Sequence, residues 1–289
     1  MSLVITNEEL DAIRFYIGDI ELAKKNVYRG GDKAYQTINA LLNYGYRNEI
    51  DKAKEGKIVE LYDSDHLKSY LKLIILVFSA SLKYRNIIKD KDKYMSSYRV
   101  DRASSLDEFI NNNNTIEGFF STCKYGLLPQ YAHTKKDIVL LEVIRDSKTP
   151  YIDYQDLLGV NYSKPEEAEI LIPFGTCISN AKNVPLTNEE KEKYYDLNGN
   201  MPRGKWIIKL TEGNYDLLDK SIEEEYYNYI CNEQVVSKII KTMKKLTLSK
   251  RLNKDEKEFY TEWKKKLIAY INSCSEKLRI KYSINNINN

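Results

Sequence analysis

Apolar residues recur at helical spacing through the first ninety residues of the chain. Three segments show this pattern, and they begin near Asn7, Asp32 and Leu67. Each follows a polar or acidic turn that can cap a helix. The third runs to about Tyr84 and is apolar on most sides, which predicts burial between other elements. The N-terminal part of the chain is therefore predicted to be a set of packed helices.

From about Ser96 the pattern changes to short apolar runs separated by Asn, Gly, Pro and Lys. Such runs are typical of β-strands. The candidate strands are Tyr98–Asp101, Ile116–Thr122, Ile138–Ile144, Glu169–Phe174, Cys177–Ser179 and Lys205–Leu210. After Thr211 helical spacing returns and continues to about Tyr282. Helices, then strands that do not alternate regularly with helices, then helices again indicate an α+β fold rather than a doubly wound sheet.

The chain has enough apolar material for a folded core. Of its 289 residues, 42% are hydrophobic and 30% are charged, which excludes a disordered chain. We predict one catalytic domain over residues 1–212, with a helical part at 1–90 and a β-rich part at 96–212. Residues 213–289 are predicted to form a separate C-terminal helical region.

Charge is distributed unevenly along the chain. There are 45 Lys and Arg against 42 Asp and Glu, a net charge of +3, which argues neither for nor against a nucleic-acid partner. No nucleic-acid partner is expected. Residues 234–282 hold 14 Lys and Arg but only 5 Asp and Glu. Their lysines are interspersed with apolar residues at helical spacing, which favours a solvated helix face. A delivery or binding partner that docks on these basic C-terminal helices stays open.

The sequence offers little for metal or membrane chemistry. There are two histidines, and no two of the four cysteines lie within three residues of each other, so no metal site is expected. The longest uncharged apolar stretch, Leu73–Leu82, is shorter than the roughly 20 residues that span a bilayer. The first residues lack the pattern of a secretory signal peptide. We expect no membrane span, and either a cytoplasmic location or secretion by another route.

Three of the predicted strands carry polar residues on an apolar background. The motifs are Tyr98-Arg99-Val100, Gly118-Phe119-Phe120-Ser121-Thr122-Cys123 and Glu166-Glu167-Ala168-Glu169-Ile170-Leu171-Ile172-Pro173. Alternation along a strand would put Glu167 and Glu169 on one side, where two carboxylates repel each other. Arg99 offers a planar fork for a diphosphate or a carboxylate. A site with one Arg, one Ser and two Glu suits an anionic dinucleotide whose reacting sugar becomes cationic.

The order of these motifs resembles the Arg-Ser-Glu class of mono-ADP-ribosyltransferases, which includes clostridial binary-toxin enzymes and vertebrate ecto-enzymes. An Arg strand is followed by aromatic-x-Ser-Thr and then by Glu-x-Glu, an apolar triplet and Pro, and the resemblance covers residues 30–212. It implies two small packed β-sheets with NAD in the cleft between them, an N-terminal helical cap and a C-terminal helical appendage. It also implies a toxin-like bacterial enzyme that consumes NAD as a substrate and needs no metal.

The resemblance implies a role for each matching residue in NAD cleavage. Arg99 would bind the NAD phosphates, and the backbone of Val100 would meet the nicotinamide amide. Ser121 would hold the catalytic glutamate and the nicotinamide ribose, with support from Thr122. Glu169 would hydrogen-bond the ribose 2′-hydroxyl and stabilise the cation as nicotinamide leaves.

Two further positions concern nicotinamide and the acceptor. Phe119 would pack near nicotinamide. Glu167 would orient or deprotonate the acceptor, and in this family a glutamate there goes with an arginine of a target protein, since a carboxylate matches a guanidinium in a bidentate pair. The chain departs from the family pattern at Val100, where glycine is common, at Cys123, where a third hydroxyl is expected, and at Lys164, where an aromatic residue is expected.

Three alternatives stay beside this interpretation. Tyr28-Arg29-Gly30 matches the Arg motif better locally, but it precedes the helices and is interpreted as a turn. An NAD glycohydrolase would use the same residues with water as the acceptor. A non-catalytic interaction module would keep the fold and bind a partner through its basic helices.

Overall fold

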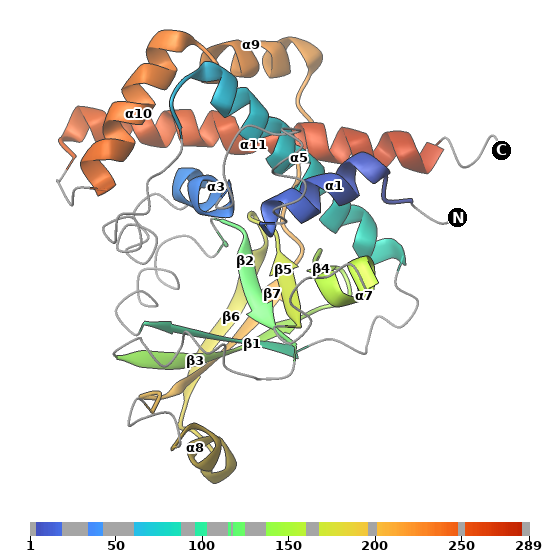
Figure 1. Cartoon of the computed structure of the whole chain (residues 1–289), viewed down its shortest axis with the longest axis vertical. Helices are drawn as coiled ribbons and strands as arrows, with labels where there is room; N and C mark the ends of the chain where they lie inside the picture. Colours follow the sequence, from blue (N-terminus) through green and yellow to red (C-terminus); the bar gives the residue numbers. More distant parts are fainter. Residues whose placement is uncertain are drawn as a thin grey trace. The chain divides into compact units, whose positions relative to one another are not determined.

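The structure, a computed structural model, describes residues 4–18, 34–42, 61–87, 96–102, 115–116, 118–124, 137–159, 168–195, 201–247 and 252–284. The chain forms two compact units. Residues Met1–Ile87 and Tyr215–Asn289 make up a helical unit, and Ile88–Asn214 make up a unit that carries the β-sheet (Figure 1). The predicted α+β class is confirmed.

Both ends of the chain contribute helices to the helical unit. These helices are α1 (Asn7–Tyr16), α3 (Ala34–Leu42), α5 (Ser64–Ile87), α9 (Lys220–Ile230), α10 (Glu233–Thr247) and α11 (Lys254–Ile284). The predicted N-terminal helices are therefore present, although α1 is capped by Thr6 instead of Asn7. The Thr6 side chain accepts from the Glu9 backbone N–H, and the Glu9 carboxylate accepts from the Thr6 backbone N–H, which makes a capping box.

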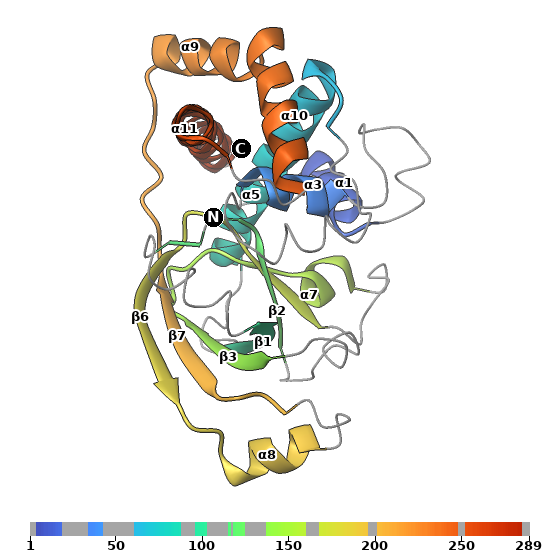
Figure 2. The same cartoon turned by 90° about the vertical axis from the view of Figure 1, so that its left-hand side faces the viewer.

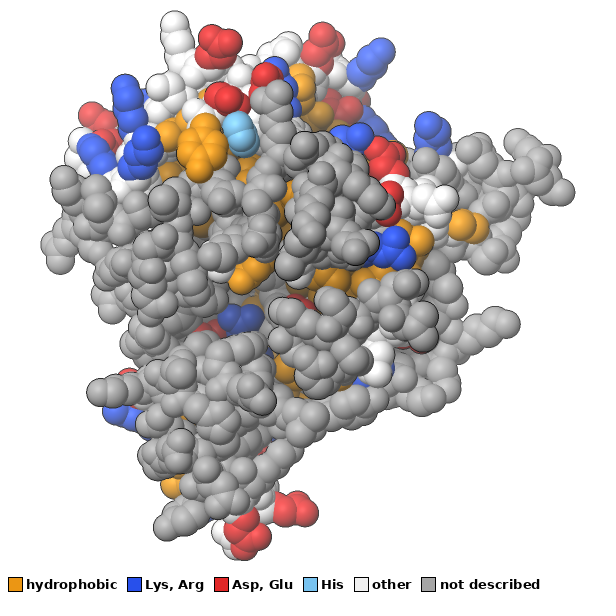
Figure 3. All heavy atoms as spheres, in the orientation of Figure 1, with side chains coloured by type: hydrophobic (Ala, Val, Ile, Leu, Met, Phe, Trp, Pro, Cys, Tyr) orange, Lys and Arg blue, Asp and Glu red, His pale blue; other side chains and the backbone are white. Residues whose placement is uncertain are grey.

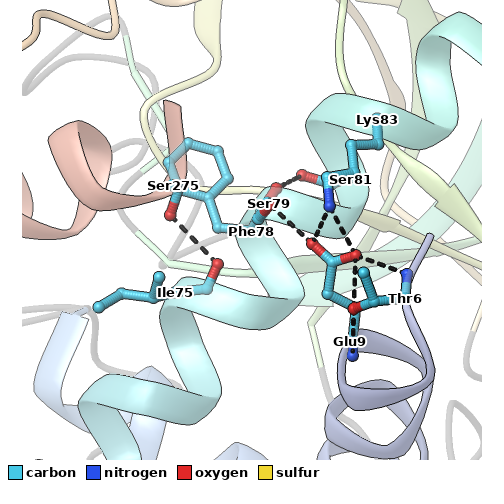
Figure 4. A network of polar contacts seen from close by, with 8 residues as sticks. All are labelled: Thr6, Glu9, Ile75, Phe78, Ser79, Ser81, Lys83 and Ser275. Carbon is cyan, nitrogen blue, oxygen red and sulfur yellow. Dashed lines mark hydrogen bonds and ion pairs between the residues drawn. The ribbon is translucent and has the colours of Figure 1, made fainter. Parts of the chain in front are cut away.

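Glu9 also takes part in a buried ion pair that joins α1 to α5 (Figure 4). Its carboxylate oxygens lie 2.7 and 2.8 Å from Lys83 Nζ, and the two side chains are 1% and 0% exposed. The Ser79 hydroxyl donates to the same carboxylate at 2.7 Å. Because a buried charge is costly unless it is paired and hydrogen-bonded, this network fixes how α1 packs on α5.

The C-terminal helices pack in the same unit as the N-terminal ones. Trp263 and Tyr260 of α11 are fully buried, and the Tyr260 hydroxyl donates to the Leu41 carbonyl of α3 at 2.9 Å. The Ser275 hydroxyl of α11 donates to the Ile75 carbonyl of α5 at 3.2 Å (Figure 4). Residues from both ends of the chain therefore share one core.

The basic block at 234–282 is interleaved with acidic residues in three dimensions. Its described ion pairs include Lys245–Glu256, Lys254–Glu258, Lys266–Glu262, Lys277–Glu223 and Arg279–Glu276. Figure 3 shows side chains of both charge signs mixed over the helices of this unit on the face that it draws. Five of the 14 basic side chains of this block are thus paired, four of them with carboxylates of the block itself and Lys277 with Glu223 of α9.

The described residues of the sheet unit form short strands and two short helices. Its elements are β1 (Ser96–Arg102), β2 (Phe120–Cys123), β3 (Ile138–Arg145), β4 (Ile152–Asp153), α7 (Tyr154–Leu158), β5 (Glu169–Ile172), β6 (Cys177–Val184), α8 (Asn188–Tyr195) and β7 (Lys205–Thr211). The strands form one seven-stranded sheet in the order β4-β5-β2-β1-β3-β7-β6. All neighbours pair antiparallel except β3 and β7, which are parallel.

The expected two small sheets are joined into this one sheet. The link is the pairing of β1 with β2, which consists of a single register pair, Tyr98 with Cys123. By contrast, β1 pairs with β3 along its whole length, from Ser96 to Arg102. In Figure 1 the strands β2 and β5 run across the direction of β1 and β3. The sheet therefore has two differently oriented arms that meet at one short junction.

Two helices and one strand of this unit are not among the sequence predictions. β4 and α7 are two and five residues long, too short to produce a periodic signal. Helix α8 consists almost entirely of charged residues and tyrosine, so it lacks an apolar stripe. Figure 2 shows β6 and β7 side by side, with α8 at the far end of this ribbon. There Lys205 binds Glu190 of α8 at 2.7 Å and Glu142 of β3 at 3.1 Å.

Among the described residues, no helix is both long and apolar enough to cross a membrane.

The buried pair between α1 and α5 predicts a large effect of Lys83→Met. This change leaves the Glu9 carboxylate buried without its cation, so we expect the free energy of unfolding to fall by about 3–5 kcal/mol. Denaturant unfolding followed by circular dichroism measures the loss. The matched control is Lys72→Met, because Lys72 pairs with Glu8 between the same two helices at 2.7 Å but both side chains are more than half exposed. We expect that control to change the free energy by less than about 1 kcal/mol, and equal losses in the two variants would contradict the account.

The ion pair on α8 predicts a pH-dependent stability. Burial alone would raise the pKa of Glu190, but hydrogen bonds from Lys205 and Thr187 bring this pKa below its usual value. A lowered pKa means that ionised Glu190 stabilises the fold above its unfolded pKa and that this stability is lost as pH falls through the folded value. Glu190→Gln should therefore melt at a lower temperature than the wild type at neutral pH. The difference should shrink below about pH 4, and a difference that is constant with pH would be the contrary result.

Candidate active site

Ser121 and Glu169 are brought together by the pairing of β2 with β5. In this antiparallel register Cys123 lies opposite Glu169, and Ser121 lies opposite Leu171. Ser121 and Glu169 are therefore diagonal neighbours on one face, a spacing that a long side chain can bridge. The Ser121 hydroxyl donates a hydrogen bond to Glu169 Oε1, and both side chains are partly exposed. A carboxylate fixed by a hydroxyl and still open to solvent is available to a ligand.

The Arg99 side chain extends from β1 and contacts β2. Its Nη1 donates to the Ser121 carbonyl oxygen at 3.0 Å, and its guanidinium carbon lies 4.7 Å from the centre of the Phe120 ring. Its Nε donates to Asp101 Oδ2 at 3.1 Å. The structure thus brings the three predicted site residues Arg99, Ser121 and Glu169 into one connected set.

The members of this set approach β2 from its two faces. Successive residues of a strand point to opposite sides, so Phe120 and Thr122 face away from the Ser121 hydroxyl. Arg99 stacks on Phe120, while the Ser121 hydroxyl meets Glu169 on the other face. Thr122 is buried, and its hydroxyl donates to Ser97 Oγ at 2.8 Å. Thr122 therefore supports the strand from inside the fold.

The side chains of Val100 and Phe119 belong to the core. Val100 packs with Ile138, Leu140 and Leu186. Phe119 is 5% exposed, and its ring lies edge-on to that of Phe174 at 5.3 Å between centroids. A contact from Val100 to a ligand would have to come from its backbone, which is the role the resemblance implies. The role of Phe119 beside nicotinamide stays a prediction.

Glu167 lies outside the described residues, as do Lys164 and Tyr28-Arg29-Gly30. What the structure does describe is the residue between the two glutamates. Ala168 is buried and has a φ of 39°, and β5 begins only at Glu169. Because this left-handed conformation is not that of a strand, the alternation that predicted Glu167 and Glu169 on one side does not extend through Ala168.

Two acidic residues near the site are not singled out by the sequence analysis. Asp101 holds Arg99 and is fully buried. Asp153 lies 2.5 Å from Lys124 Nζ, and the Lys124 backbone N–H donates to the Ala168 carbonyl at 3.0 Å. The two-residue spacing from Arg99 along a strand puts both on one side, but it does not show that Asp101 is buried, so the sequence alone does not single it out.

The opposite face of β1 carries a separate cluster of charged groups. Tyr98 lies opposite Glu142 in the pairing of β1 with β3. Burial raises the pKa of Tyr98, and the nearby Glu142 carboxylate raises it further. For Lys205, burial lowers the pKa, but the hydrogen bonds to Glu190 and Glu142 outweigh this and raise it overall. These groups hold α8 and β7 in place. The pairing of Tyr98 with Cys123, and of Cys123 with Glu169, puts them on the face of Glu169, but Glu142 stands three strands away from it.

Across the described ranges, no group of three or more His, Cys, Asp or Glu side chains is arranged to hold a metal ion.

Comparisons with known proteins give limited similarity. No family model matches the sequence, and no curated protein sequence matches it. One solved structure that matches is the crystal structure of BECa, an ADP-ribosylating toxin of a binary enterotoxin of C. perfringens, with NADH. The two chains are 16% identical, with a TM-score of 0.32. The match covers 73% of this chain and 49% of the toxin chain, so this chain spans about half the length of that protein. At this level of similarity, function has to be inferred from the chain's own residues.

Removal of each of the two neighbouring hydroxyls of β2 is expected to lower the free energy of unfolding by a different amount. Thr122→Val deletes a buried donor to Ser97, so we expect a loss of about 1–3 kcal/mol in the free energy of unfolding. Ser121→Ala deletes a hydroxyl that is partly exposed, and water can solvate the Glu169 carboxylate in its place, so the expected loss is below about 1 kcal/mol. Denaturant unfolding of the two variants tests this. A larger loss for Ser121→Ala than for Thr122→Val would show that Ser121 is mainly structural.

Proposed function

We propose that this protein is a mono-ADP-ribosyltransferase that cleaves NAD and transfers ADP-ribose to an arginine side chain of a target protein. The observation that carries the proposal is the hydrogen bond between Ser121 and Glu169, which are 48 residues apart in the chain. Arg99, 22 residues before Ser121, is tied to the same strand. Three motifs that resemble one family in their order thus supply side chains to one connected set. Ser121 and Glu169 meet on one face of β2, and Arg99 holds the same strand from its other face.

The side chains of this set suit the chemistry of nicotinamide loss. The bond between the nicotinamide nitrogen and the ribose C1′ breaks, its electron pair stays on the nitrogen, and positive charge develops on the ribose. A carboxylate placed in advance beneath that charge stabilises it without having to reorganise during the reaction. Glu169 is this carboxylate in the proposal, and the Ser121 hydroxyl keeps it oriented. NAD fits here as a substrate, since the partly exposed carboxylate can also accept from a ribose hydroxyl.

Arg99 has two parts in the proposal. Its guanidinium is a permanent cation with a planar set of donors, suited to the NAD phosphates. It also holds the backbone of β2 through the Ser121 carbonyl. The first part contributes to NAD binding, and the second to the position of the hydroxyl beside Glu169.

The acceptor step is assigned to Glu167 by the family resemblance. A guanidine nitrogen of the target arginine forms the new bond to C1′ and gives up a proton, and a carboxylate next to it can both orient the guanidinium and take that proton. With water instead of arginine, the same site would hydrolyse NAD. The two activities therefore differ in the acceptor and share the cleavage step.

The proposal is tested by nicotinamide release from NAD, measured for the wild type and Glu169→Gln with and without a small guanidine acceptor. We expect release by the wild type that is stimulated by the acceptor, and ADP-ribose on the acceptor. Glu169→Gln should lower the rate by about 100- to 1000-fold, because the neutral amide cannot stabilise the developing cation. Glu142→Gln is the control, since it removes a carboxylate of the neighbouring strand β3 from the cluster around Lys205.

Three other results would change the conclusion. Hydrolysis that the acceptor does not stimulate would favour an NAD glycohydrolase. Equal rates for the wild type and Glu169→Gln would remove Glu169 from the mechanism. A folded wild type that neither binds NAD nor releases nicotinamide would contradict an enzyme and favour the non-catalytic module.

A further inference from the structure

We propose that Asp101 is a positioning residue of this site, which fixes Arg99 so that Arg99 in turn sets the position of Ser121. The inference rests on the proposed function, because it concerns the same cleavage step. It starts from the burial of Asp101, whose side chain is 0% exposed although it carries a carboxylate. A carboxylate withdrawn from water is costly unless a cation or several donors compensate it.

The cation beside Asp101 is Arg99, two residues earlier on β1. The two side chains lie on the same side of the strand, and Arg99 Nε donates to Asp101 Oδ2 at 3.1 Å. The Arg99 side chain is 19% exposed, so the pair has one end inside the fold and one end toward solvent. Asp101 is therefore the buried anchor, and Arg99 is the group that extends from it.

Three contacts together define the plane of the Arg99 guanidinium. Nε is directed at Asp101, Nη1 is directed at the Ser121 carbonyl, and the carbon between them lies over the Phe120 ring. A guanidinium can make these contacts at once because its donors form a rigid planar fork. An ammonium group is a point charge and cannot bridge Asp101 and the Ser121 carbonyl in the same way.

The junction that Arg99 bridges has the shortest pairing among the described strands. In that part of the chain β1 and β2 share the single register pair Tyr98 with Cys123, so the backbone ladder does little to fix β2 against β1. The Arg99 bond to the Ser121 carbonyl crosses this junction, as does the bond from Thr122 to Ser97. The place of Ser121, and hence of the hydroxyl that meets Glu169, depends on Arg99 and on what holds Arg99.

The charge of Asp101 also affects how strongly Arg99 attracts a phosphate. The carboxylate compensates the guanidinium, so the pair as a whole is close to neutral and attracts a phosphate less strongly than a lone cation would. Loss of Asp101 removes this compensation, which favours phosphate binding, and also loosens Arg99, which disfavours it. These two effects on NAD binding oppose each other, so the geometry of the cleavage step should suffer more than the binding of NAD. In kinetic terms, kcat should fall while KM for NAD stays nearly constant.

The test is the kinetics of nicotinamide release for Asp101→Asn, Arg99→Lys and the double variant, beside the wild type. Displacement of a reacting group by about 1 Å can cost on the order of 100-fold in rate, and we expect a fall in kcat of that size for Asp101→Asn with KM for NAD within about threefold. Because Asp101 acts through Arg99, the double variant should be no slower than Arg99→Lys alone. Glu142→Gln, which breaks a carboxylate–cation pair on β3, three strands from Glu169 in the order of the sheet, should leave kcat unchanged.

Several outcomes would overturn the inference. One is a kcat of Asp101→Asn equal to that of the wild type. Another is a rise in its KM for NAD at constant kcat. A third is a rate loss in the double variant that equals the sum of the losses of the two single variants. If Asp101→Asn does not fold, the kinetics of Asp101→Glu test the inference instead. This change keeps the buried charge paired but moves the carboxylate. We expect a folded variant with a lowered kcat, and full activity of Asp101→Glu would refute the role. A wild type without nicotinamide release would instead overturn the proposed function, and this inference with it.

Discussion

The candidate site depends above all on the register between β2 and β5. A shift of one residue along either strand would turn Ser121 or Glu169 to the other face and separate the hydroxyl from the carboxylate. Ile170, Leu171 and Ile172, which follow Glu169 in β5, are all buried, so a shift that turned Glu169 inward would place its carboxylate in the core at a high cost. The apolar and hydroxyl positions that build the core thus also determine where the polar pair stands.

Buried ion pairs lie at several contacts between helices and strands of this fold. Glu9 with Lys83 joins two helices, and Asp153 with Lys124 joins the β4–α7 corner to the end of β2. Arg99 lies at the junction of the two arms of the sheet, where it is anchored by Asp101. Such pairs add little net stability compared with apolar packing, but an arrangement that separates them is strongly disfavoured. The high cost of separating a buried pair explains why charged residues lie where secondary-structure elements meet, and not only on the surface.

The sequence predicts the periodic elements well and the junctions poorly. β3 and β7 begin where the apolar runs predict and extend one residue further, since buried runs give a clear signal. The two-residue strand β4 and the polar helix α8 carry no such period, and their places come from long-range contacts such as Lys205 with Glu190. The choice of Arg99, Ser121 and Glu169 came from the order of the motifs. The order of the motifs does not point to Asp101. In sequence, an acidic residue after an arginine in a strand is by itself indistinguishable from a solvated one.

The most direct test of the central claim is a crystal structure of the Glu169→Gln variant with intact NAD. Since the variant is expected to cleave NAD slowly, the substrate should persist long enough to be seen. The account predicts the nicotinamide ribose against Gln at position 169 and the Ser121 hydroxyl, with the phosphates on the side of Arg99. NAD bound elsewhere on the protein, or a ribose remote from the Ser121 hydroxyl, would contradict it.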